Sequence, residues 1–518
     1  MPLTLWMPPV ETSDEEKRLL SRCKKSRLFV FLREHRHELF DESFQREFLA
    51  TYPERKSGKK PVAPALLAMV TVLQAALHVS DEDAVEFAVM ERRWQMVLGT
   101  LGEDEPPFSQ GSLVNFRARM IAHDLDRRLL ERTVELAKQT RGFGATALRA
   151  AFDSSPLFGA GRVEDTFNLI GHAVRDVLET IALREGKSRD EVAVQAGIPL
   201  LTGASIKAAL DIDWEDRAQK AGALERLVAQ VRALQAFLER EHQQTLTEPP
   251  LSHQWATVQE ILAQDTEPDP NGGGVRIKEG VAKERRISIS DRQMRHGRKS
   301  KTSRVDGYKR HLAVDLDLKL NLAAAVLPAN RPDQEAAGVL FADIERQGLD
   351  VSQLHHDLGY LAAPDVLRRH NEGMEIHCKP FPLRNGERFT KADFQLDFAQ
   401  GEIICPAGKH APLVEGAVTR FPAKACAQCA LRARCTTATN GRSISVHAQE
   451  QLLVRLRTEQ KTVAGRAELR RRTGVEHKLA ALSRTQGRRA RYRGVRKNLF
   501  DVRRHAAVDN LYVTARAA

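Results

Sequence analysis

The stretch YKRHLAVDLDLKLNLAAAVLP (residues 308–328) decides the fold class. Its two halves, 308–316 and 320–328, are rich in apolar residues and are separated by a short Asp-Leu-Lys turn, which predicts a β-hairpin. Working outward, we predict a strand at 147–152, helices at 332–347 and 362–370, strands at 351–356 and 374–379, and helix-prone sequence at 452–485. A hairpin followed by alternating helices and strands predicts an α/β protein with a mixed sheet.

The region before this sheet reads as helix. It contains two helix-capping signals, SDEE (13–16) and SDED (80–83), and we interpret residues 1–145 as a helical N-terminal domain. A helical unit that carries Arg117 and Arg119 either reads DNA or presents ordinary solvated charges.

A second domain is predicted from residue 146 to residue 518. A helical insertion at about 165–300 separates its first two strands, and most of that insertion reads as one long helical stretch from 164 to 241. The composition of residues 265–275 (DTEPDPNGGGV) predicts a linker. A second insertion, at about 382–455, contains a cluster of cysteines.

The charge of the chain is concentrated in two places. The 518 residues contain 80 Lys and Arg against 68 Asp and Glu, a net charge of +12. Residues 281–310 carry +8 and residues 451–518 carry +13, so the other 420 residues carry −9. Two strongly basic segments in an otherwise acidic chain favour a polyanionic partner such as nucleic acid. The alternative is solvated surface charge.

The sequence does not indicate a membrane protein. Its longest nearly apolar stretch, 66–77, is interrupted by Thr71 and Gln74 and is too short to span a bilayer. The first residues, MPLTLWMPPVETSDEEKR, lack the basic-then-apolar order of a signal peptide. We therefore expect a cytoplasmic protein.

Three acids stand where an active site on such a sheet would place them. Asp153 ends the first predicted strand, before the turn residues Ser-Ser-Pro (154–156). Asp357 follows the strand at 351–356, and Glu476 lies in a late helical run. Carboxylates in this arrangement can hold two Mg²⁺ ions for in-line phosphoryl transfer.

Each acid also has an ordinary structural interpretation. The first two precede turn residues and would cap those turns. Glu476 would pair with Arg472, one helical turn earlier. Asp315 and Asp317 compete as acids, but they fall at the hairpin turn, where we expect them to be solvated.

Six segments together are more specific than any single acid. They are YPERKSGKKPVAPALLAMV (52–70), FDSSPLFGAGRVEDT (152–166), MRHGRKSKTSRVDGYKRHLAVD (294–315), LPANRPDQ (327–334), HHDLGY (355–360) and RTGVEHKLAALSRTQGRRARYRGVRKNLFDVRR (472–504). The ordered set covers nearly the whole chain and resembles bacterial insertion-sequence transposases of the DDE type, in particular the eleven-eighty-two branch. The resemblance implies an RNase H-like catalytic core in which Asp153, Asp357 and Glu476 are the catalytic, metal-binding triad for two Mg²⁺ or Mn²⁺ ions.

The same resemblance implies the function. The protein would bind the ends of an insertion sequence and catalyse metal-dependent DNA cleavage and strand transfer, with double-stranded DNA (terminal inverted repeats and target) as its partner in the bacterial nucleoid. Two ends must be brought together, so a homodimer or larger assembly is expected. The alternatives are a metal-dependent nuclease that cuts without joining and a non-catalytic DNA-binding repressor.

One motif departs from the family pattern. Related transposases often carry a Tyr–Arg–Glu–Lys signature around the last acid. Arg472 and Glu476 match it, but Leu469 and Ser483 stand at the Tyr and Lys positions. Arg484, one residue later, is a candidate substitute for the Lys.

The basic segments flank the predicted active site. The candidate DNA-binding residues are Arg295, Arg298, Lys299, Lys301, Arg472, Arg484, Arg488, Arg489, Arg491, Arg493, Arg496 and Lys497, the later ones forming a basic segment at 484–504. Contacts to phosphates position DNA without reading its sequence, so we expect steep salt dependence from these residues and sequence readout from the N-terminal domain.

Four of the six cysteines are clustered. Cys405, Cys426, Cys429 and Cys435 form the pattern C-x20-C-x2-C-x5-C, which suits tetrahedral thiolate coordination of one structural Zn²⁺. The alternative is a set of reduced, metal-free cysteines in a packed insertion. Cys23 and Cys378 are expected to be ordinary buried thiols.

Overall fold

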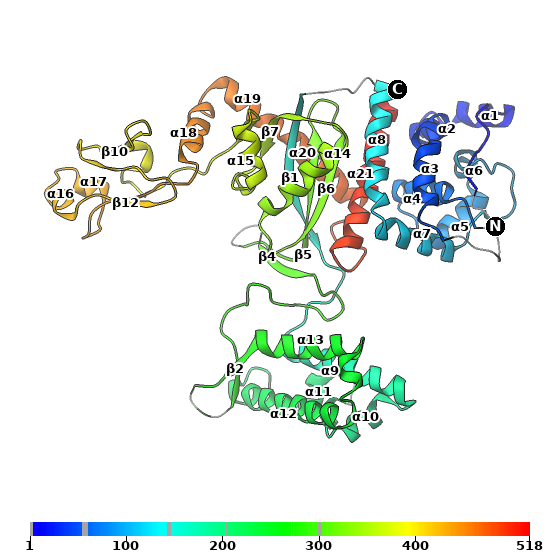
Figure 1. Ribbon diagram of the computed structural model, residues 1–518, viewed down its shortest axis with the longest axis horizontal. Coiled ribbons are helices and arrows are strands. Elements are labelled where there is room, and N and C mark those ends of the chain that lie inside the picture. The colour runs from blue at the N-terminus through cyan, green and yellow to red at the C-terminus, as the bar shows by residue number, and fades with distance from the viewer. Residues whose placement is uncertain are drawn as a thin grey trace.

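The computed structural model describes residues 4–53, 61–141, 147–201, 205–270, 272, 274–298 and 302–517. Figure 1 shows a central sheet with the N-terminal helices on one side and a small extended lobe on the other. A separate group of helices stands beyond one end of the sheet.

The central sheet has six strands. They are β1 (Leu148–Phe158), β4 (Arg295–Arg298), β5 (Arg304–Asp315), β6 (Asn321–Pro328), β7 (Val351–His356) and β8 (Glu375–Cys378). β5 pairs antiparallel with β1, β4 and β6, whereas β7 pairs parallel with β1 and β8. The resulting order β6–β5–β1–β7–β8 confirms the predicted mixed sheet and its hairpin at 308–328.

The first strand is longer than predicted. β1 continues through Asp153 to Phe158, so the Ser-Ser-Pro segment is strand and not turn. Phe158 N donates to Arg488 O, so this N–H points away from β5. Backbone groups alternate along a strand, so the nitrogen of Pro156, two residues earlier, faces the same edge. β7 ends opposite Phe152, so the edge of β1 beside Pro156 has no neighbouring strand. The missing N–H of Pro156 therefore leaves the pairing of β1 with β5 intact.

Helices cover both faces of the sheet. Ala150 and Phe152 pack in one apolar core with α14 (Ala337–Arg346) and α15 (Pro364–Asn371). Ala151 packs in another, with α20 (Thr473–Thr485) and α21 (Val495–Ala517). Because side chains alternate along β1, Asp153 projects from the α20 face.

The predicted helical N-terminal region is confirmed. Its helices are α1 (Asp14–Arg22), α2 (Arg27–Leu39), α3 (Glu42–Leu49), α4 (Pro64–Leu77), α5 (Asp81–Met90), α6 (Arg92–Leu98), α7 (Gln110–Ala122) and α8 (Leu125–Arg141). Both predicted capping boxes form. Among the described residues no single helix is long and apolar enough to cross a membrane; only α4 and α5 taken together pass that test, with a bend of 103° between them.

The chain between β1 and β4 forms its own apolar core. Its elements are α9 (Thr166–Glu185), α10 (Arg189–Gln195), α11 (Ile206–Leu210), α12 (Arg217–Glu241), α13 (Leu251–Asp265), β2 (Thr266–Pro268) and β3 (Val275–Ile277). The prediction of one long helical stretch was wrong, because Gly186 and Gly197 adopt left-handed backbone angles that end α9 and follow α10. The predicted linker at 265–275 begins and ends in the paired strands β2 and β3.

A small lobe and two helices connect β8 to α20. The lobe contains β9 (Gln395–Asp397), β10 (Glu402–Ile404), β11 (His410–Pro412), β12 (Val418–Arg420), α16 (Ala423–Ala427), α17 (Arg432–Cys435) and β13 (Ser443–Ser445). α18 (Glu450–Glu459) and α19 (Val463–Arg471) then lead back to the sheet.

A buried ion-pair network joins the N-terminal helices to the core. Arg503 on α21 contacts Asp124 at 2.6 Å, Asp126 at 3.2 Å and Asp343 on α14 at 3.0 Å. The side chains of Arg503, Asp126 and Asp343 are almost fully buried. Arg503 therefore belongs to the structural framework, although it lies within the basic segment 484–504.

Replacing Arg503 by Met should destabilise the protein by about 3–5 kcal/mol, because two buried carboxylates lose their shared cation. Urea unfolding followed by circular dichroism measures this change. Arg516→Met, an exposed position on the same helix, is the matched control and should change the free energy of unfolding by less than about 0.5 kcal/mol. Equal effects of the two substitutions would contradict the framework role.

Candidate active site

Asp153 lies on β1, and Asp357 directly follows the neighbouring parallel strand β7. Phe152 on β1 is opposite His356 at the end of β7, so the next residue in each segment is an aspartate. Neighbouring strands are about 4.8 Å apart and side chains alternate, so both carboxylates project from the same face. Asp357 Oδ1 also accepts a hydrogen bond from Gly359 N at 2.9 Å, so its turn-capping role and its place beside Asp153 coexist.

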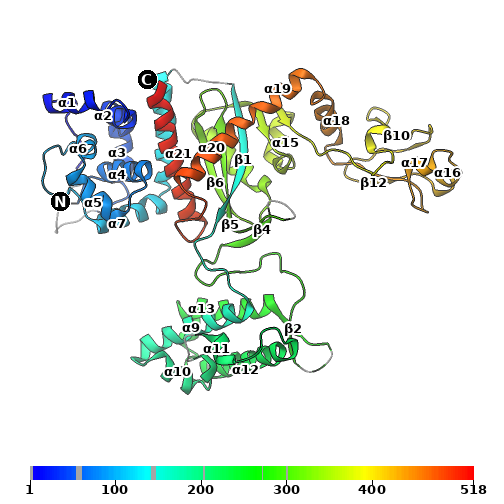
Figure 2. The same cartoon turned by 180° about the vertical axis from the view of Figure 1, so that it is seen from behind.

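Glu476 reaches the same face from a helix. α20 crosses the sheet beside β1, as Figure 2 shows, and Glu476 lies in its first turn. The Arg472 guanidinium joins two of the acids: Nη1 lies 2.9 Å from Asp153 Oδ2, and Nη2 pairs with Glu476 Oε1. The structure therefore brings the three predicted acids together, with a cationic side chain between Asp153 and Glu476.

The electrostatics of this cluster favour added positive charge. Burial raises the pKa of Asp153 to about 6, and the neighbouring Asp357 and Glu476 carboxylates add to the rise against the lowering effect of Arg472. Burial likewise raises the pKa of Asp357. Closely spaced carboxylates with raised pKa values lose their mutual repulsion when a divalent cation binds.

A fourth acid, Asp333, was missed by the sequence reasoning. Ser154 Oγ donates to its Oδ2 at 3.0 Å, and Lys309 forms an ion pair with it. After burial, the charge of Asp333 is the largest cause that raises the pKa of Asp357. The acid lies in the motif LPANRPDQ (327–334), where its local sequence does not distinguish it from an acid in the first turn of a helix.

A buried polar layer supports the turn after β7. His356 Nδ1 lies 2.6 Å from the backbone oxygen of Asp357, and the Tyr360 hydroxyl lies 2.6 Å from His311 Nδ1. Burial lowers the pKa of both His311 and His356 to about 4, so both rings are neutral at pH 7. These contacts hold the backbone that carries Asp357 without adding charge.

The competing acids of the hairpin differ from expectation in one case. Asp317 is exposed and pairs with Arg149, as a solvated turn residue would. Asp315 is fully buried, and its Oδ2 accepts a hydrogen bond from Leu318 N at 2.5 Å, so it stabilises the turn from inside. The prediction that Asp315 is solvated was wrong, because the turn folds back over its side chain.

Most of the predicted DNA-contacting residues are exposed. Within the described part of the chain, the following side chains form no ion pair: Arg484, Arg488, Arg489, Arg491, Arg493 and Lys497. Most of them lie in the loop 486–494 between α20 and α21, which pairs with the end of β1 through Phe158. Arg298, at the end of β4, is also exposed.

The other predicted DNA contacts are engaged within the protein or fall outside the described residues. Arg496 pairs with Asp126, and Arg295 donates to two backbone carbonyls, whereas Arg472 sits among the acids. Lys299 and Lys301 lie outside the described residues.

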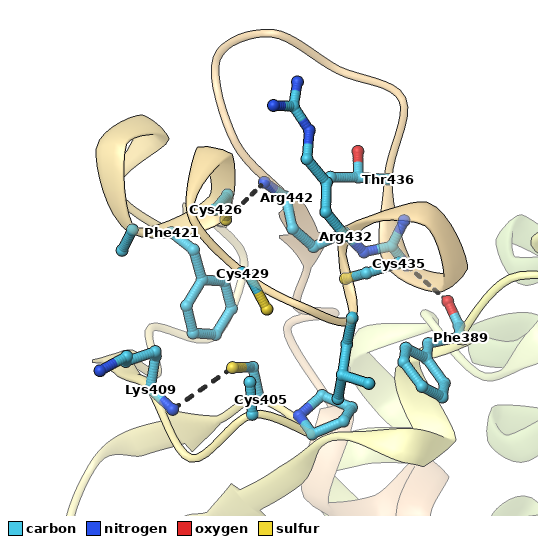
Figure 3. A pocket seen from close by; sticks show the side chains of 14 residues that line it. Phe389, Cys405, Lys409, Phe421, Cys426, Cys429, Arg432, Cys435, Thr436 and Arg442 are labelled. Atoms are coloured by element: carbon cyan, nitrogen blue, oxygen red, sulfur yellow. Dashed lines mark hydrogen bonds between the residues drawn. The ribbon is translucent and has the colours of Figure 1, made fainter.

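The four clustered cysteines line one cavity of about 30 Å³, shown in Figure 3. Backbone N–H groups point at two of the sulfurs: Lys409 N lies 3.3 Å from Cys405 Sγ, and Arg442 N lies 3.5 Å from Cys426 Sγ. Arg432 and Arg442 also line the cavity. N–H donors and cations around sulfur stabilise the thiolate form that binds metal.

Two family models match separate parts of the chain. A model described as Transposase domain (DUF772) matches residues 21–119, within the N-terminal helices, and a model described as Transposase DDE domain matches residues 404–515, which include Glu476. No curated protein and no solved structure is similar enough to match.

Proposed function

We propose that this protein is a DDE-type insertion-sequence transposase, which binds the ends of its element and catalyses metal-dependent DNA cleavage and strand transfer; the two transposase family matches support this proposal. The observation that carries the proposal is the convergence of Asp153, Asp357 and Glu476 on one face of the sheet. We assign these three residues the catalytic, metal-binding roles.

The strand order supports an RNase H-like core. Three antiparallel strands, β6, β5 and β1, are followed by two strands parallel to β1, and the late helix α20 packs across β1. Numbered in chain order without the short strand β4, the strands run 3-2-1-4-5 across the sheet. This topology puts the central strand and its parallel neighbour side by side, and these are the two strands that carry the aspartates.

The residues present fit divalent cations. Three carboxylates supply the hard oxygen ligands that Mg²⁺ or Mn²⁺ prefers, and Arg472 supplies positive charge between two of them. Two bound ions would activate the attacking water or DNA 3′-hydroxyl and stabilise the charge that develops on the phosphate. Arg472 would turn from the carboxylates to a DNA phosphate, and Lys309 would hold Asp333 away from the reacting groups.

Two assays with Mg²⁺ distinguish the proposal from its alternatives. Uncut element ends test cleavage, and pre-cut ends with a target plasmid test joining. We expect products in both assays, and none in EDTA. Cleavage without joining would identify a nuclease, and binding without either product would identify a repressor.

We propose double-stranded DNA as the partner and a homodimer or larger assembly as the active form, acting on DNA in the bacterial nucleoid. The loop 486–494, with its exposed arginines, pairs with Phe158 at the end of β1, the strand that also carries Asp153. A duplex whose phosphate is at the triad would therefore pass close to this loop.

We also propose that the cysteine lobe holds one structural Zn²⁺. Four thiols around a cavity with room for about one water-sized particle match the closed tetrahedral shell of a structural site. The lobe has a small apolar core of its own, so a metal would supply much of its stability.

Zinc analysis of the purified full-length protein tests this site. Replacing Cys429 by Ser should lower the zinc content by one ion per chain and lower the melting temperature, because one ligand of four is lost. Cys23→Ala, which changes a buried cysteine in the N-terminal helices, should leave the zinc content unchanged. Equal zinc in the Cys429→Ser variant and the unsubstituted protein would exclude a four-cysteine site.

A further inference from the structure

Another group of side chains that can bind metal lies on the α20 face of the sheet. It begins at His355, two residues before Asp357 in the chain. His355 on β7 and His377 on β8 are register partners, and their rings stack with centroids 4.5 Å apart. Glu468 on α19 approaches them, with Oε2 4.0 Å from His355 Nε2. One ligand atom from each residue lies within 4.8 Å of the other two.

Most polar atoms of this group are buried without hydrogen-bond partners. Among the described residues, neither ring nitrogen of His355 has a partner, nor does His377 Nε2, whereas Glu468 Oε2 is paired with Arg471. His355 is completely buried. A buried polar atom without a partner costs about 1–3 kcal/mol, so the unpartnered nitrogens of two adjacent histidines are unfavourable unless something satisfies them together.

Two contacts border the group. The Arg471 guanidinium, which is partly exposed, lies 2.8 Å from Glu468 Oε2 as an ion pair. Glu375 Oε2 lies 3.6 Å from His377 Nε2 and supplies a second carboxylate at the exposed edge. Neither contact satisfies the ring nitrogens of His355.

We propose that His355, His377 and Glu468 bind a transition-metal ion of the Zn²⁺ class. Two imidazoles and one carboxylate are an established zinc ligand set, whereas imidazole ligands disfavour Mg²⁺. Tetrahedral ligands at 2.0–2.1 Å from zinc lie about 3.3 Å apart, so the side chains need to close by roughly 1.5 Å or less. One ion bound by all three side chains would satisfy an unpartnered nitrogen of each histidine at once.

The site would fix the helix that carries the third acid. Glu468 lies on α19, and Arg472 and Glu476 follow four and eight residues later, at the start of α20. A metal ion that is bound by Glu468 on α19 and by His355 and His377 on the sheet would anchor α19 against β7 and β8. The ion is thus a positioning element for α20, separate from the catalytic cations and from the cysteine lobe.

Zinc content and thermal stability of the full-length protein test the proposal without an activity assay. The protein is dialysed against a zinc buffer free of Mg²⁺ and analysed by inductively coupled plasma mass spectrometry. His377→Leu should contain one zinc ion fewer per chain than the unsubstituted protein, whatever the cysteine lobe contributes. Its melting temperature should also respond less to zinc, because binding to the folded state stabilises it by mass action.

Two further variants keep this result decisive. Glu468→Gln, which keeps the size of the side chain, should also lose one zinc ion. His253→Leu, an exposed histidine on α13, should lose none. Unchanged zinc content in folded His377→Leu and Glu468→Gln would overturn the proposal and leave a metal-free histidine pair, whether or not the DNA reactions occur.

Discussion

Replacing Asp153 or Asp357 by Asn should reduce the rate of DNA strand cleavage by about a thousandfold or more. A carboxylate that holds a catalytic metal is worth several kcal/mol in the transition state, and each 1.36 kcal/mol is tenfold in rate. Gel-based cleavage of labelled element ends in Mg²⁺ measures the loss. Binding of the same ends should stay nearly intact, because the exposed arginines of the 486–494 loop are untouched.

The control is Asp317→Asn, which removes an exposed acid in the β5–β6 turn and should leave cleavage unchanged.

The stability of the Asp153→Asn variant distinguishes a loss of catalysis from misfolding. The folded-state pKa of Asp153, about 6 against an ordinary 3.8, means that its charged form disfavours folding by roughly 3 kcal/mol. This cost is absent below about pH 4, grows as the pH rises towards 6 and is complete above it.

Asp153→Asn, which is neutral at every pH, should therefore be at least as stable as the unsubstituted protein at pH 7.5 without metal. Added Mg²⁺ should raise the melting temperature of the unsubstituted protein and not that of the variant. Full cleavage by a folded Asn variant would remove its aspartate from the catalytic set.

Much of the sheet could be predicted because short segments that contain apolar and β-prone residues alternate with turn-forming residues. The hairpin at 308–328 and the strands near Asp357 and His377 were placed within a few residues, since local composition alone separates them from their flanking turns. The end of β1 could not be placed, because Pro156 marks a turn in most contexts. Only its position on an edge that faces away from β5 makes the proline compatible with the strand.

The part of the site that follows from the pairing of strands could be predicted from the sequence. The part that depends on tertiary packing could not. Parallel pairing of β1 with β7 puts Asp153 beside Asp357 once both strands are known. Asp333 reaches them only through the fold of the segment after β6, so nothing in its local sequence distinguishes it from a helix cap.

The net charge of residues 451–518 also overstates the positive charge that is available to bind DNA. Its +13 counts Arg503 and Arg504, which are buried in ion pairs, and Arg496, which pairs with Asp126. Sequence gives the number of charges but not their partners. The part of the charge that remains for DNA is concentrated in the loop between α20 and α21.

The exposed arginines of the 486–494 loop, together with Arg484 at the end of α20, should dominate the salt dependence of DNA binding. The test variant changes five arginines to Gln together: Arg484, Arg488, Arg489, Arg491 and Arg493. Each lost phosphate contact reduces the slope of log K against log salt by about 0.9, so we expect the slope to fall by roughly 4–5. Between 50 and 200 mM salt, the unsubstituted protein should therefore lose roughly 500-fold more affinity than the variant.

Fluorescence anisotropy with labelled element ends and with random duplex measures both affinities across this salt range. The ratio of the two affinities should not change in the variant, because phosphate contacts do not read sequence. The control removes the same charge from α12, by changing Arg217, Lys220, Arg226, Arg232 and Arg240 to Gln, and should leave the slope nearly as it was. An equal fall in slope for both variants would show that long-range charge governs binding, and not contact of DNA with the 486–494 loop. The proposal that DNA bound at the triad passes this loop would then be wrong.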